Sequence, residues 1–140
     1  MLKIITDPEN KKRIVRFIKF GVVGTSGIFV NMFFLWLFHE KIGLSVFISS
    51  VFAIGIAIFN NFMWNDFWTW NNAEEKKYSF LHRLWRYYIS ASLGGLINNV
   101  TLVVLTEYFG LYYLIANLIG IFFGMVSNFT LGEFWVFKKK

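Results

Sequence analysis

Two groups of charged and aromatic residues have side-chain types that suit a phosphate or a sugar. The first group is Arg13, Arg16, Lys19, Asp66 and Trp68. The second group is Arg83, Arg86, Glu133 and Trp135. Arginine presents a planar fork of N–H donors that suits bidentate contact with phosphate. The groups therefore predict either a phosphate head-group site or a membrane anchor in which arginine pairs with Asp or Glu.

The composition indicates that these groups belong to a membrane protein. The chain has 140 residues, of which 56% are hydrophobic and 16% are charged, whereas soluble domains have about 45–50% apolar and about 25% charged residues. The net charge of +6 does not indicate nucleic-acid binding, because so few charges cannot cover a basic face. The absence of Cys excludes disulfides, Cys-based zinc sites, iron–sulfur clusters and thiol catalysis.

Four apolar stretches are long enough to cross a bilayer, which takes about 20 residues. They cover approximately Phe20–Phe38, Leu44–Trp64, Tyr87–Leu105 and Leu111–Leu131. None of them contains an acidic or basic residue. The connectors Glu40–Gly43 and Thr106–Gly110 are so short that each pair of helices must form an antiparallel hairpin. We therefore expect an all-α integral membrane protein with four transmembrane helices in a single domain.

Basic residues are shared unequally between the two ends of these hairpins. Lys41 is the only one of the 14 Lys and Arg residues that lies in a short connector. The others, Lys3 among them, lie in the N-terminal segment, the middle loop and the C-terminal tail. Because Lys and Arg accumulate on the cytoplasmic side, we expect both termini and the middle loop to be cytoplasmic. We also expect the protein to be in the cytoplasmic membrane and to attract anionic membrane lipid.

The second half of the chain repeats the first. Arg13 to Phe17 aligns with Arg83 to Tyr87, and after a shift of three residues near the outer loop Asn61 aligns with Asn128. The first repeat covers about residues 13–70, the cytoplasmic loop about 71–82 and the second repeat about 83–137. An even number of spans in each repeat predicts a parallel repeat about an axis along the membrane normal.

Asparagines interrupt the apolar spans, and an amide exposed to lipid would lose its hydrogen bonds to water. They include Asn61, Asn98, Asn99 and Asn128. Each is expected to face another helix, a ligand or a wet cavity, and interhelical contact is the simplest role. Asn98 and Asn99 cannot both face one neighbouring helix, because adjacent residues point about 100° apart.

Small residues spaced four apart predict close helix packing. Gly120 and Gly124 share a helix face with Asn128, and Ala53 and Ala57 take the matching positions before Asn61. We expect this stripe to pack helices together, with the asparagine as a polar contact at its cytoplasmic end.

Catalytic patterns are absent from the sequence. It has no phosphate-binding glycine loop, no nucleotide fingerprint and no carboxylate near the centre of a span. His39 and His82 are expected on opposite sides of the membrane, so they cannot share a metal ion. We therefore expect no catalytic residues, no metal, no cofactor and no enzyme activity.

The ends of the hairpins carry a family resemblance. The segments are Arg-Phe-Ile-Lys-Phe-Gly-Val-Val-Gly from Arg16, Asn-Phe-Met-Trp-Asn-Asp-Phe-Trp-Thr-Trp from Asn61 and Asn-Phe-Thr-Leu-Gly-Glu-Phe-Trp-Val-Phe from Asn128. In their order and spacing they resemble the GtrA-like family over about residues 13–138. The resemblance implies a role in cell-surface polysaccharide synthesis, as a flippase that moves a polyprenyl-phosphate-linked monosaccharide to the outer leaflet beside a membrane glycosyltransferase.

The resemblance and the residues together suggest a site at the inner interface. Its phosphate side would be Arg16 and Arg86 with Arg13, Arg83 and Lys19. Its sugar side and polar path would be Asp66, Glu133, Asn61, Asn98, Asn99 and Asn128. Trp68 and Trp135 would stack on the sugar or anchor the chain at the interface.

Three further expectations concern assembly and alternative functions. A homo-oligomer is expected, because four spans make a thin wall around a path wide enough for a sugar. The main alternative is a subunit that recruits a glycosyltransferase and transports nothing. A small drug exporter is a second alternative, but it would need a central carboxylate.

Overall fold

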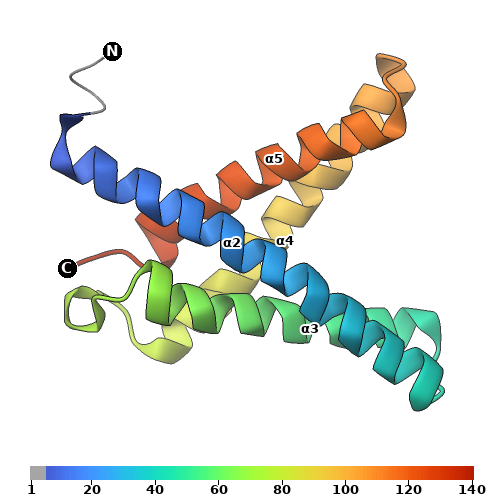
Figure 1. Cartoon of the computed structure of the whole chain (residues 1–140), viewed down its shortest axis with the longest axis horizontal. Helices are drawn as coiled ribbons and strands as arrows, with labels where there is room; N and C mark the ends of the chain where they lie inside the picture. The colour runs from blue at the N-terminus through green and yellow to red at the C-terminus, as the bar shows by residue number, and fades with distance from the viewer. Residues whose placement is uncertain (1–5) are drawn as a thin grey trace. The chain divides into compact units, whose positions relative to one another are not determined.

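The computed structural model describes residues 6–140, which contain four long helices (Figure 1). They are α2 (Pro8–Trp36), α3 (Val46–Trp64), α4 (Phe80–Val103) and α5 (Tyr113–Leu131). Together with the turns that extend them, all four are long and apolar enough to cross a membrane. The prediction of an all-α, four-span membrane protein is therefore confirmed. Lys3 lies outside the described residues.

Each helix extends beyond its apolar stretch. At its C-terminal end each one continues into a π-helical turn, and these turns are Leu37–Lys41, Asn65–Thr69, Val104–Tyr108 and Gly132–Val136. At the other end, α2 begins at Pro8 because the Asp7 side chain accepts a hydrogen bond from the backbone N–H of Glu9. Proline suits the first helical position, where its missing N–H has no partner to lose.

Two glycines make the tight turns possible. Gly43 connects α2 to α3 with a φ of +83°, and Gly110 connects α4 to α5 with a φ of +66°. Glycine adopts this left-handed conformation without steric cost, because it has no Cβ. The helices of each pair are thus antiparallel neighbours, as the short connectors predicted (Figure 1).

The chain divides into two compact units, residues 1–73 and 74–140. The first unit contains the α2–α3 hairpin, and the second contains the α4–α5 hairpin. The segment before α4 belongs to the second unit because it is bound to the tail after α5. Lys77 donates a backbone hydrogen bond to Lys138, and Lys140 donates one to Glu75, both at 2.8 Å.

Small residues bring the two helices of each hairpin together. In the first unit Ala53 and Ala57 are buried, and a Cβ on Gly27 would overlap the side-chain amide of Asn61. In the second unit a Cβ on Gly94 would overlap Asn128 in the same way.

The glycine stripe on α5 completes this packing. A Cβ on Gly124 would lie 2.6 Å from the carbonyl oxygen of Gly94, and one on Gly120 would lie 2.7 Å from that of Asn98. The predicted packing role of the small-residue stripe is confirmed.

The two hairpins repeat these contacts at one constant spacing of 67 residues. It relates Gly27 to Gly94 in the first helix of each hairpin, and Asn61 to Asn128 in the second. The expected shift of three residues near the outer loop is therefore wrong, because Gly94 matches Gly27 rather than Gly24. The counterpart of Arg86 is consequently Lys19 and not Arg16.

Candidate functional site

The charged residues predicted to form a site lie at one end of each hairpin, opposite its tight turn. We call this the open end. In the first unit it comprises the beginning of α2 and the π turn Asn65–Thr69. In the second unit it comprises the beginning of α4 and the π turn Gly132–Val136.

At the first open end, Lys19 contacts Trp68. The Lys19 Nζ donates a hydrogen bond to the carbonyl oxygen of Trp68 at 3.4 Å and lies 5.2 Å from the centre of its ring. Beneath this contact, Phe20 meets Trp70 edge to face, with ring centres 6.0 Å apart. The buried aromatic pair fixes the rotation of α2 about its axis relative to the π turn. As a result, Lys19 faces Trp68.

The second open end repeats the contact with arginine. Arg86 Nη1 donates to the carbonyl oxygen of Trp135 at 3.1 Å, and the guanidinium carbon lies 5.1 Å from the centre of the Trp135 ring. Tyr87 and Phe137 form the supporting pair, with ring centres again 6.0 Å apart. Both open ends thus hold a cation against the tryptophan of a π turn.

Arg86 contacts two more rings that the sequence prediction of the site did not include. Its guanidinium carbon lies 3.7 Å from the centre of the Tyr78 ring and 5.6 Å from that of Trp85. Trp85 meets Trp135 edge to face, with ring centres 5.9 Å apart. The signal that could have revealed this cluster is the spacing of Tyr78, His82 and Trp85, which recur every three or four residues before Arg86.

The environment of Arg86 changes the acidity of Tyr78. A hydrogen bond from Arg86 to the phenol is the largest cause and lowers the pKa of Tyr78. Burial of the phenol opposes this effect, while the positive charges of Arg86, Lys77 and Lys138 add to it. Arg86 at the second open end therefore influences the ionisation of a tyrosine in the loop before α4.

The other predicted arginines are engaged near their own helix. Arg16 pairs with Glu9 at 3.3 Å, and only 11% of its side chain is exposed. Arg13, a turn earlier on α2, is half-buried. Arg83 is buried and donates to the backbone carbonyl of Tyr78. In this arrangement Lys19 and Arg86, rather than Arg16 and Arg86, form the matching pair of cations.

The predicted carboxylates lie in the π turns, two residues before the tryptophans. Asp66 is buried and Glu133 is half-buried, and neither is without a partner. The side chain of Thr69 donates to that of Asn65 at 2.8 Å within the first of these turns. Each turn therefore places a carboxylate, an aromatic ring and a carbonyl acceptor close together in sequence.

The asparagines differ in their exposure. Asn61, Asn98 and Asn128 are half-buried between the helices of their hairpins, and the Oδ1 atom of each is buried without a hydrogen-bond donor in the described chain. Asn99 is exposed. The expectation that Asn98 and Asn99 cannot both face one helix is confirmed.

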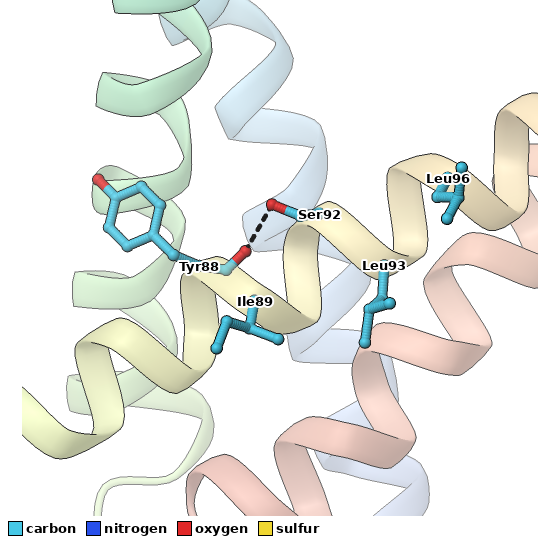
Figure 2. Close-up of a pocket in the computed structure, with 5 residues that line it drawn as sticks. All are labelled: Tyr88, Ile89, Ser92, Leu93 and Leu96. Carbon is cyan, nitrogen blue, oxygen red and sulfur yellow. Dashed lines mark hydrogen bonds between the residues drawn. The ribbon is translucent and has the colours of Figure 1, made fainter.

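A shallow hollow of about 340 Å³ lies on α4 and is mostly apolar (Figure 2). Its lining residues are Tyr88, Ile89, Ser92, Leu93 and Leu96. The Ser92 hydroxyl donates to the backbone carbonyl of Tyr88 at 2.8 Å, as the dashed line in Figure 2 shows. Because its own helix satisfies this hydroxyl, the hollow presents little polar chemistry. Among residues 6–140, no three His, Asp or Glu side chains gather as metal ligands would.

Comparison with known proteins identifies a family and a relative. The family model described as "GtrA/DPMS, transmembrane domain" matches residues 19–137. A protein from Pyrococcus furiosus named dolichol-phosphate mannosyltransferase is 42% identical over 108 residues. That match covers 77% of this chain but 30% of the relative. The chain therefore corresponds to less than a third of that protein.

Proposed function

Because the chain belongs to the GtrA/DPMS transmembrane-domain family, we propose that it moves a polyprenyl-phosphate-linked monosaccharide from the cytoplasmic to the outer leaflet of the cytoplasmic membrane. It is a small multi-pass membrane domain, and the family is connected with polyprenyl-phosphate sugars. The sugar lipid would be made by a separate membrane glycosyltransferase. The domain itself would carry out no covalent chemistry.

The observation that carries this proposal is the repeated cation–tryptophan contact at the two open ends. Lys19 and Arg86 each lie where an apolar span begins and are held by a π turn. A polyprenyl phosphate has its charge at this depth, because its tail stays in the hydrocarbon while its head group stays in the interface. Charge-assisted hydrogen bonds to phosphate are about twice as strong as neutral ones.

The carboxylates and asparagines support the path of the sugar. Asp66 and Glu133 would position the cations or accept hydrogen bonds from sugar hydroxyls. The buried oxygens of Asn61, Asn98 and Asn128 need donors, and sugar hydroxyls are donors. Asn99, being exposed, would join the path only from the outer face of its hairpin.

Transfer of a labelled lipid-linked sugar in proteoliposomes tests the function and its site. We expect Lys19→Gln and Arg86→Gln to slow transfer at least about tenfold, which corresponds to losing about 1.4 kcal/mol of interaction. Arg16→Gln should have a smaller effect because Arg16 pairs with Glu9.

Lys41→Gln is the matched control. Lys41 also lies over a tryptophan, 5.3 Å from the centre of the Trp36 ring, but at the other end of the first hairpin. Its loss should leave the rate unchanged. Transfer at the normal rate in both Lys19→Gln and Arg86→Gln would exclude these cations as the phosphate site.

A recruiting subunit is the second candidate function. The named relative favours this function, because it is called a transferase and the match covers only 30% of its length. In that case the chain would hold a glycosyltransferase at the membrane. Co-purification with the transferase, combined with no lipid transfer by the purified chain, would support this reading against the first.

A further inference from the structure

The two open ends are chemically unequal. Around Arg86, the rings of Tyr78, Trp85 and Trp135 lie with their centres 3.7, 5.6 and 5.1 Å from the guanidinium carbon. We call these four residues the Arg86 cluster. His82 extends it, since its ring stacks on Tyr78 and also contacts Trp85, each with centres 5.8 Å apart.

The first repeat keeps the counterpart of Trp135, which is Trp68, but it has no aromatic residues at the positions of Tyr78 and Trp85. At the spacing of 67 residues, Tyr78 corresponds to Lys11 and Trp85 to Ile18. A tryptophan that only anchors a helix in the interface can lie anywhere around that helix. Anchoring therefore does not explain why three rings converge on one arginine in the second repeat.

The cluster leaves part of the arginine free to bind. Rings lie over the guanidinium, whereas its N–H donors point outward in its own plane. Nη1 is bonded to the Trp135 carbonyl, but Nε is buried and has no acceptor among residues 6–140. An uncompensated buried charged donor is unfavourable, and a phosphate oxygen would supply the missing acceptor.

The rings also leave apolar surface for a second group. Trp85 is 45% exposed even though it contacts both Arg86 and Trp135. The face of a sugar ring carries C–H groups with slight positive charge, which suit the negative face of an aromatic ring. A phosphate bound to Arg86 would place an attached sugar beside Trp85.

We propose that the Arg86 cluster is a recognition site for a monosaccharide phosphodiester, in which Arg86 binds the phosphate and Trp85 stacks on the sugar. This inference rests on the proposed function and adds that the sugar ring is stacked in the second repeat and not in the first. Lys19 and Trp68 then receive the phosphate without distinguishing what it carries. Tyr78 and Trp135 are positioning residues that hold the guanidinium.

Binding measurements with the purified full chain in detergent test this site. The two probes are a short-chain polyprenyl phosphate that carries mannose and the same lipid phosphate without a sugar. We expect Trp85→Leu to weaken binding of the mannosyl probe by about fivefold to tenfold and that of the bare phosphate by less than about twofold. Arg86→Gln should weaken both probes.

Two variants control for damage to the fold. Trp85→Phe keeps an aromatic face and should retain most of the preference for the mannosyl probe. Trp36→Leu removes a tryptophan that is exposed to a similar degree, 47%, at the opposite end of a hairpin, and should change neither affinity. Equal losses for both probes in Trp85→Leu, or no loss for either, would overturn the proposal.

A transfer assay separates this proposal from the proposed function. If wild-type protein prefers the mannosyl probe and Trp85→Leu loses that preference, the cluster is supported even when no lipid crosses the membrane, and only transport fails. If lipid crosses while Trp85→Leu discriminates as well as wild type, transport stands and the cluster proposal fails.

Discussion

At the scale of single residues, Arg86 illustrates why arginine, rather than lysine, suits a cation that aromatic rings cover. A guanidinium tolerates being covered by rings, because its charge is delocalised and it is more weakly hydrated than an ammonium. A lysine in the same surroundings would lose its proton more readily. Arginine therefore suits the second open end, where several aromatic rings surround the cation. Lysine suits the first open end, where Lys19 contacts the ring and the backbone carbonyl oxygen of Trp68.

The acidity of Tyr78 reports whether Arg86 is in place. Subtracting the alkaline ultraviolet titration of Tyr78→Phe from that of the wild type should isolate a phenol whose pKa lies below the usual value, because Arg86 bonds to it. In the Arg86→Gln background the same difference should move to higher pH. An unchanged titration there would show that Arg86 does not set the acidity of this phenol.

The sign of the associated stability effect follows from the direction of the shift. The pKa of Tyr78 is lower in the folded chain than in the unfolded one, so the phenolate favours the folded state. This contribution is absent well below the folded pKa, where the phenol is protonated in both states. It develops as the pH rises through the folded pKa and is complete above the unfolded value of about 10.

At the scale of elements, the close approach of two helices depends on which glycine is replaced. A Cβ on Gly94 would overlap Asn128, whereas a Cβ on the adjacent Gly95 would meet nothing within 4 Å. We expect Gly94→Ala to destabilise the chain by about 1–3 kcal/mol, the usual range for overpacking. Gly95→Ala should be neutral or slightly stabilising, because alanine favours the helix. Unfolding in mixed detergent micelles, followed by circular dichroism, measures both.

A double substitution shows whether the overlap is the cause. In the Asn128→Ala background, Gly94→Ala should cost much less, because the side chain with which its methyl group collides has been shortened. If the losses in unfolding free energy of the two single substitutions simply add, the destabilisation by Gly94→Ala has another cause along α4. The same test applies to Gly27 and Asn61 in the first hairpin.

At the scale of the whole molecule, the natural chain lacks Cys, so that single cysteines can report its orientation. A cysteine at Asn72 should react with a membrane-impermeant maleimide only after the cells are permeabilised. Cysteines at Ile42 or Phe109, both exposed near a tight turn, should react in intact cells. The expected pattern follows from the positive-inside rule, and labelling of Asn72→Cys in intact cells would contradict it.

The four spans could be predicted from sequence because bilayer thickness alone requires a long apolar stretch. The alignment of the two repeats could not be predicted as reliably. The Arg-x-x-Arg pairs from Arg13 and from Arg83 share letters but occupy different positions in their hairpins. Packing constrains Gly27 and Gly94 through Asn61 and Asn128, whereas the arginines of the two pairs make different contacts in the two hairpins.

The partners of the arginines also depend on details that composition does not contain. Arg16 reaches back along α2 to Glu9, and Arg86 reaches across to the π turn of α5. Whether an arginine contacts its own helix or the opposite π turn depends on the rotation of the helix about its axis and on the residue at which the helix begins. The Asp7 cap extends α2 far enough to bring Glu9 into range of Arg16, and an apolar pattern alone does not reveal that extension.

The geometry of the candidate site depends on the number of residues in each π turn as well as on their types. A π turn is an α-helix with one residue inserted. Deleting the exposed Phe67 from the turn Asn65–Thr69 would restore an ordinary helix and rotate Trp68 by about 100° about the axis relative to the preceding helix, with Lys19 and Trp68 both still present. Insertions and deletions at these turns would therefore redirect the tryptophans more than most substitutions would, and natural variation in length should avoid them.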